Sequence, residues 1–137
     1  MFKVYLAIHA APDNLLGYVH EDGKVYRGRV GFDEHLGGVD LATGKVFSHR
    51  FGPDKKVGHV DLKNGKVYLT KSGPDEYFGR VDSDGSMHRH VPMGVDAYVG
   101  KVNQFLSFAH SAGAMLLLVL PALEEQGQNE PLDNKEI

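Results

Sequence analysis

The chain has 137 residues and a mass of 15.1 kDa, which suits one domain rather than two. Its 15 Lys and Arg residues against 18 Asp and Glu give a formal net charge of −3, which argues against a nucleic-acid-binding protein with a basic surface. Hydrophobic residues make up 42% of the chain, enough for a packed core, and the absence of cysteine excludes disulfides, a thiol nucleophile and cysteine-based metal centres.

Glycine reveals an internal repeat. Three series of glycines recur with a step of 20 or 21 residues. The series are Gly17, Gly37, Gly58, Gly79 and Gly100; Gly23, Gly44, Gly65 and Gly85; and Gly31, Gly52, Gly73 and Gly94. A repeat of this length indicates an architecture assembled from copies of one small unit.

Each unit is predicted to be a β-hairpin. A Lys-Val-Tyr triplet begins the second strand of the units. It recurs at residues 3–5, 24–26, 45–47 and 66–68, with phenylalanine in place of tyrosine in the third of these copies. Dipeptides such as Asp22-Gly23 come just before it and favour tight hairpin turns, because glycine tolerates a positive φ. Strand alternation places valine on one face and Lys and Tyr on the other, so valine is expected inside.

The units are predicted to close into a ring. Four hairpins are complete, and they span residues 17–31, 37–52, 58–73 and 79–94. Residues 3–13 supply only a second-strand half, and residues 98–102 supply only a first-strand half. If the first strand pairs with the last, the ring has no exposed sheet edge. We therefore expect a mainly β fold over residues 1–103, a closed five-fold pseudo-symmetric ring of hairpin repeats.

This pattern resembles the five-fold β-flower proteins of bacteria. The resemblance rests on the hairpins of about 21 residues, on glycine at three fixed places and on the split unit that joins the termini, and it covers residues 1–103. It implies a fold and no reaction, because the function of that family is uncharacterised. Hairpin repeats of the MORN type are similar in size and glycine usage, but their Tyr-x-Gly openings are not kept here.

Residues 104–123 are predicted to form an apolar helix. The stretch from Phe105 to Leu123 has no charged side chain apart from a protonatable His110. Asn103 is the expected N-cap, and Pro121 is expected to bend or end the helix. Because apolar residues surround the helix, it must be buried.

Three burials of this helix are open: over the ring, against copies of itself, or in a bilayer. The sequence favours a homo-oligomer, and the polar residues within the stretch disfavour the membrane. The expected interface residues are Phe105, Phe108, Ala112, Met115, Leu116 and Val119.

The two ends of the chain are expected to be simple. Residues 124–137 hold five acids and one lysine, which predicts a disordered, solubilising tail. No signal peptide is recognised at the N-terminus, where the short apolar run already fits the repeat, so a cytoplasmic location is expected.

Histidine offers the first candidate chemistry. His88 and His90 are two apart in a predicted strand and share one face, a spacing that can chelate Zn²⁺ or Ni²⁺. His49, at a related position in an earlier repeat, could be a third ligand. The alternative is that these histidines are ordinary polar residues of the sheet surface.

Other recurring residues have a structural and a functional interpretation. Asp40, Asp61 and Asp82 could form a Ca²⁺ site or could satisfy backbone groups at strand ends. A second series of aspartates is expected to stabilise turns: Asp33, Asp54, Asp75 and Asp96. The lysines of the triplets, with the tyrosines beside them, could bind a polyanion or a carbohydrate or could form a solvated face.

No sequence motif predicts an enzyme. The chain has no G-x-S-x-G elbow, P-loop or dinucleotide fingerprint, and no cofactor is expected. The leading hypothesis is a binding or scaffolding module that self-associates through its C-terminal helix, with an unidentified ligand. The alternatives are a histidine-based metal-binding protein or metal-dependent hydrolase, and a membrane-anchored repeat protein.

Overall fold

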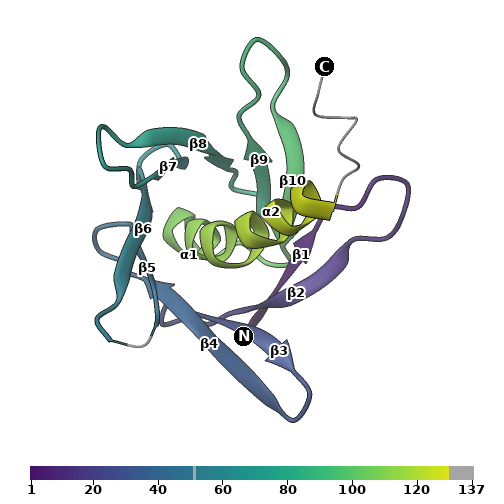
Figure 1. The fold of residues 1–137 in the computed structure, drawn as a ribbon, viewed down its shortest axis with the longest axis vertical. Helices are drawn as coiled ribbons and strands as arrows, with labels where there is room; N and C mark the ends of the chain where they lie inside the picture. The colour runs from purple at the N-terminus through teal and green to yellow at the C-terminus, as the bar shows by residue number, and fades with distance from the viewer. Residues whose placement is uncertain (51, 130–137) are drawn as a thin grey trace.

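The computed structural model describes residues 1–50 and 52–129. Ten strands precede one long helix (Figure 1). The strands are β1 (Phe2–Leu6), β2 (Asn14–Val19), β3 (Lys24–Arg29), β4 (Phe32–Val39), β5 (Lys45–Ser48), β6 (Lys55–Val60), β7 (Lys66–Leu69), β8 (Glu76–Val81), β9 (Ser86–Arg89) and β10 (Ala97–Val102). The helix comprises α1 (Phe108–Ala114), a π-helical turn η1 (Met115–Val119) and α2 (Leu120–Asn129).

The strands form a closed antiparallel barrel. Each strand pairs with its neighbours in sequence, and β1 pairs with β10 to complete the circle. At this seam Val4 faces Val102 and Tyr5 faces Lys101. The predicted closed ring of five hairpins is therefore confirmed. The turn glycines Gly23, Gly44, Gly65 and Gly85 have φ between 77° and 93°, as the hairpin turns require.

The barrel is lined by five aliphatic cross-strand pairs. The pairs are Val4 with Val102, Val19 with Val25, Val39 with Val46, Val60 with Val67, and Val81 with Met87. All ten side chains are buried. The prediction that the triplet valines point inward is confirmed, and Met87 takes the valine position in the fourth repeat.

Five β-bulges, one in each repeat, bend the sheet. The ladder shifts register next to each glycine of the first series, for example between Val25 and Tyr26 beside Gly37. A Cβ atom on any of these five glycines would lie 2.1–2.4 Å from a carbonyl oxygen of the adjacent strand. Only glycine allows this close approach, and the repeated bulges supply the curvature that closure needs.

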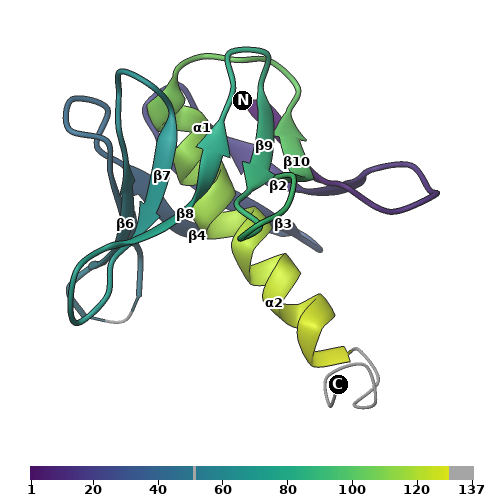
Figure 2. The ribbon, with the colours of Figure 1, turned by 90° about the horizontal axis from the view of Figure 1, so that it is seen from above.

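The helix occupies the inside of the barrel. In Figure 1 it lies within the circle of hairpins, and in Figure 2 α2 extends beyond the strands. The side chains from Ala109 to Val119 are buried. The helix is thus buried against the chain's own ring, and the homo-oligomer stays a prediction. Four predicted interface residues, Ala112, Met115, Leu116 and Val119, are core residues, whereas Phe105 and Phe108 are half-buried.

The helix limits differ from the prediction. Ser107, not Asn103, is the N-cap, because its hydroxyl accepts a hydrogen bond from the His110 N–H at 3.2 Å. Asn103 instead accepts a hydrogen bond from the Lys3 N–H at 2.9 Å, across the β1–β10 seam.

Pro121 does not end the helix. The Leu120 N–H bonds to the Met115 carbonyl, the wider spacing of a π-helical turn. This turn lets the chain pass a proline, which has no N–H and would crowd the carbonyl four residues earlier.

Residues 124–129 of the predicted tail are helical, and residues 130–137 lie outside the described residues. The segment Phe108–Gly127 is long and apolar enough to cross a bilayer by length and composition, and 56% of its most apolar window is buried inside the molecule.

Candidate ligand-binding groove

The outer face of the barrel also repeats five times. Next to each inward-facing valine of a first strand stands an outward-facing residue that we call the groove residue. The groove residues are Tyr18, Gly38, His59, Arg80 and Lys101. Each faces a cross-strand partner, and in the same order these partners are Tyr26, Phe47, Tyr68, His88 and Tyr5. An aspartate follows each repeat, in a loop for Asp54, Asp75, Asp96 and, across the seam, Asp13, and near the start of β4 for Asp33.

In three repeats the groove residue is a basic side chain that contacts the loop aspartate. His59 stacks on Tyr68, with ring centroids 4.9 Å apart, and its Nδ1 lies 3.2 Å from a carboxylate oxygen of Asp75. Arg80 forms an ion pair with Asp96. In the His59 repeat the basic group therefore lies between an aromatic ring and a carboxylate, and in the Arg80 repeat it contacts the carboxylate.

The fifth repeat has the same arrangement across the barrel seam. The Lys101 ammonium lies 5.8 Å from the centroid of the Tyr5 ring and 3.9 Å from a carboxylate oxygen of Asp13. The first distance is that of a cation–π contact. The first repeat differs, because its groove residue is the neutral Tyr18.

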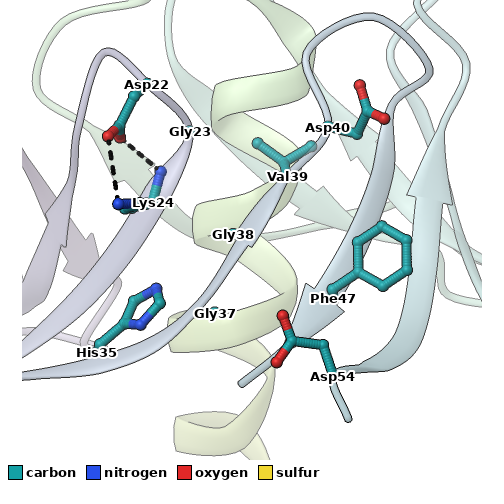
Figure 3. Close-up of a pocket in the computed structure, with 10 residues that line it drawn as sticks. All are labelled: Asp22, Gly23, Lys24, His35, Gly37, Gly38, Val39, Asp40, Phe47 and Asp54. Carbon is teal, nitrogen blue, oxygen red and sulfur yellow. Dashed lines mark hydrogen bonds and ion pairs between the residues drawn. The ribbon is translucent and has the colours of Figure 1, made fainter.

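The second repeat has no side chain at this position. Gly38 leaves a groove of about 270 Å³ between the β2–β3 turn and the β4–β5 hairpin. Figure 3 shows Phe47 projecting beside the strand that carries Gly38, with Asp40 on one side of its ring and Asp54 on the other. A second, wider cavity of about 540 Å³ lies at the equivalent place in the fifth repeat, where Lys101 is one of the lining residues.

The groove at Gly38 is rich in carboxylates. Asp22, Asp40 and Asp54 line it, and Lys24 is the only Lys or Arg among its lining residues. Asp22 lies beside Lys24, whose backbone N–H donates to it at 3.0 Å and whose ammonium is 4.0 Å away (Figure 3).

The other two carboxylates are also held in place. Asp40 accepts hydrogen bonds from the N–H groups of Ala42 and Thr43 at 2.9 and 3.3 Å. Asp54 lies 3.1 Å from the Nδ1 atom of His49. The groove is therefore a fixed site of negative charge with an aromatic side.

The structure does not assemble the predicted three-histidine site. His88 turns toward Tyr98 of β10 and His90 toward Tyr77 of β8, so the two rings contact opposite neighbours of β9. His49 stacks on His35 in another repeat. Among residues 1–50 and 52–129, no three His, Asp or Glu side chains come together in a way that could hold a metal ion.

Each of the three histidines lies beside an aspartate instead. The distances from Nδ1 to the carboxylate are 3.1 Å for His49 with Asp54, 3.2 Å for His88 with Asp82, and 3.4 Å for His90 with Asp96. These contacts, together with the ring contacts, place the histidines in the polar surface of the sheet.

Asp40 and Asp61 take the structural role that was one of the two interpretations of their series, and the second series departs from its expected role. Asp40 and Asp61 accept hydrogen bonds from backbone N–H groups two residues on, so they stabilise the tight turns. Asp82 instead binds the side chains of Arg80 and Ser86, each at 3.3 Å. The second series was expected to stabilise turns, but Asp75 and Asp96 contact groove residues and Asp54 contacts His49.

Three groups on this face have shifted pKa values. Partial burial and the Asp96 carboxylate raise the pKa of Tyr77, and partial burial together with Asp13 raises the pKa of Tyr98. Hydrogen bonds from the hydroxyl and the N–H of Ser86 lower the pKa of Asp84. The Tyr98 hydroxyl donates to Asp13 at 3.2 Å, so the same carboxylate serves both Tyr98 and Lys101.

Gly38 was not among the site residues predicted from the sequence. It lies outside the three periodic glycine series, at a position where the other repeats carry Tyr18, His59, Arg80 and Lys101. That substitution is visible once the repeats are aligned, but its meaning depends on knowing that the position faces outward. No family model, no curated protein and no solved structure matches this chain, so the resemblance to the β-flower proteins stays a prediction.

Proposed function

We propose that this protein is a binding module whose ligand site is the groove at Gly38. One observation carries the proposal: the only one of the five groove positions without a side chain opens a cavity next to an aromatic ring and three carboxylates. The equivalent cavity of the fifth repeat already holds the Lys101 ammonium beside Tyr5 and Asp13, whereas the groove at Gly38 has no such side chain of its own.

Glycine at this position is not required by the backbone. A Cβ atom on Gly38 would lie 3.2 Å from the nearest atom, the Gly23 carbonyl oxygen, whereas one on Gly37 would lie 2.1 Å from the Phe47 carbonyl oxygen. Gly37 is therefore needed for the bulge, whereas a side chain at Gly38 requires the Gly23 carbonyl to move by a few tenths of an ångström.

The rigidity of the surroundings also supports a binding site. Gly38 lies in a central position of the closed sheet, where it pairs with Lys24 on β3 and Phe47 on β5. A pocket formed on paired strands changes little when a ligand enters, so little of the binding free energy is spent on ordering the site.

The test is a fragment screen observed by ¹H–¹⁵N NMR of the intact chain. Cationic, neutral and anionic fragments are titrated into the wild-type protein, Gly38→Lys and the control Gly28→Lys. Gly28 also lies on the barrel surface, and a Cβ atom there would meet only the Tyr18 ring, at 3.7 Å.

We expect at least one fragment class to produce saturable shifts at the amides of Gly38 and Phe47. Gly38→Lys should abolish these shifts because it fills the groove, and Gly28→Lys should retain them. The absence of saturable shifts at the groove for all three classes would overturn the proposal.

A further inference from the structure

We infer that the groove at Gly38 binds an alkylammonium or alkylguanidinium group. This inference rests on the proposed function and adds the chemical class of the ligand. It follows from what the chain itself places at the equivalent positions of the fourth and fifth repeats, namely the guanidinium of Arg80 and the ammonium of Lys101, each beside an aspartate. The ligand would supply from outside the cation that the second repeat lacks.

The fifth repeat indicates how such a group would sit. There the Lys101 ammonium lies near the Tyr5 ring and the Asp13 carboxylate, at 5.8 Å from the ring centroid and 3.9 Å from the oxygen. In the second repeat Phe47 occupies the Tyr5 position and Asp54 the Asp13 position. An ammonium in the groove would therefore have an aromatic face and a carboxylate available together.

The alkyl part of the ligand would also be accommodated. In the chain's own lysine, the methylene groups leave the strand at the groove position and carry the charge toward the ring. With Gly38 in that place, the floor of the groove is bare backbone, and the Phe47 ring provides apolar lining. A short alkyl chain ending in a cation matches this combination of surfaces.

Lys24 does not prevent cation binding. Lys24 on β3 pairs with Gly38. At the equivalent positions of the next two repeats, Lys45 pairs with His59 and Lys66 pairs with Arg80. Those repeats hold a basic groove residue beside an equivalent lysine, and Lys24 is further compensated by Asp22. Lys56, the β6 neighbour of Phe47, does not line the groove.

The charge balance disfavours anions. Three carboxylates, Asp22, Asp40 and Asp54, line the groove against one lysine, Lys24. Because Lys24 already lies beside Asp22, a carboxylate ligand near Asp54 and Asp40 would meet a net negative charge, which like-charge repulsion opposes.

The experiment compares four ligands of similar size by ¹H–¹⁵N NMR titration: n-butylammonium, n-butylguanidinium, n-butanol and butyrate. We expect both cations to shift the Gly38 and Phe47 amides saturably, with a Kd about tenfold lower than that of butanol, and butyrate to produce no saturable shift. Added salt should raise the Kd of the cations and leave that of butanol unchanged.

Three variants locate the bound cation. Asp54→Asn and Phe47→Leu should each weaken butylammonium binding several-fold, because each removes one of the two groups that hold the charge. Asp33→Asn changes the equivalent carboxylate of the first repeat and should leave binding unchanged. Near-identical Kd values for wild type and Asp54→Asn would overturn the inference.

The outcomes separate the ligand class from the site itself. If butanol or butyrate binds the groove as tightly as the cations, the inference fails while the proposed function stands. If no ligand shifts the groove amides, both fail. Nα-acetyl-lysine methylamide distinguishes two sources of the cation: binding as tight as that of butylammonium indicates a lysine side chain of a partner protein, and much weaker binding indicates a free amine.

Discussion

Gly37 and Gly38 are adjacent in β4 and have opposite roles. Gly37 has φ +153° and lies at a bulge where the β5 backbone leaves no space for a side chain. Gly38 faces outward, and a Cβ atom there meets its nearest neighbour at 3.2 Å. The first glycine maintains the barrel, and the second opens the groove.

This difference predicts unequal effects of alanine at the two positions. Gly37→Ala should lower the free energy of unfolding by about 2 kcal/mol or more, because the new methyl group collides with the Phe47 carbonyl oxygen. Gly38→Ala should change it by less than about 1 kcal/mol. Urea denaturation of both variants measures the two changes in the free energy of unfolding. Equal decreases would contradict the difference between Gly37 and Gly38.

At the scale of elements, the strands could be predicted from the sequence and the location of the helix could not. The Lys-Val-Tyr triplets and the Asp-Gly turns are local signals for strands and hairpins. The two half-repeats at residues 3–13 and 98–102 indicate that the first strand pairs with the last and closes the barrel. The helix from Phe108 is apolar on all sides, so its sequence fits a barrel interior, an oligomer or a bilayer equally. Only the diameter of a ten-stranded barrel shows that a helix fits inside.

Close packing between helix and barrel predicts that Gly113 must remain small. A Cβ atom on Gly113 would lie 3.1 Å from Val39, whereas one on Gly127 would meet nothing within 4 Å. Gly113→Leu should lower the free energy of unfolding by roughly 1–3 kcal/mol through overpacking. Gly127→Leu should raise it by about 0.5 kcal/mol, since leucine favours helix over glycine. Thermal denaturation compares them, and a stable Gly113→Leu protein would argue against the helix lying inside the barrel.

At the scale of the whole molecule, the helix serves as the core of the barrel. Met115 is fully buried among residues of the same chain. The sequence could identify the apolar ring of valines and the apolar helix as two separate surfaces. It could not show that each buries the other, because that relation depends on the closed shape and not on any local pattern.

Replacing Met115 distinguishes a core residue from an interface residue. Met115→Ala should lower the free energy of unfolding by roughly 2–5 kcal/mol, as cavity formation in a core does. The molar mass in detergent-free solution, measured by light scattering during size-exclusion chromatography, should be the same for variant and wild type. A change to a smaller species with unchanged stability would show that the helix mediates self-association.

The groove illustrates what pseudo-symmetry hides from sequence reasoning. Tyr18, His59, Arg80 and Lys101 look like variable surface residues, and Gly38 looks like one more glycine in a glycine-rich chain. When the five repeats are superposed, these residues occupy equivalent positions, and Gly38 is the one without a side chain. The carboxylate of Asp54 and the ring of Phe47 gain their meaning only from that comparison.

The most direct test of this account is a crystal structure of the Gly38→Lys variant. In that structure the new ammonium should lie over the face of Phe47, at about 6 Å or less from its centroid, and beside the carboxylate of Asp54. This is the arrangement of Lys101 with Tyr5 and Asp13. A lysine that extends into solvent, or that turns away from both groups, would contradict the claim that the groove at Gly38 is a vacant cation position.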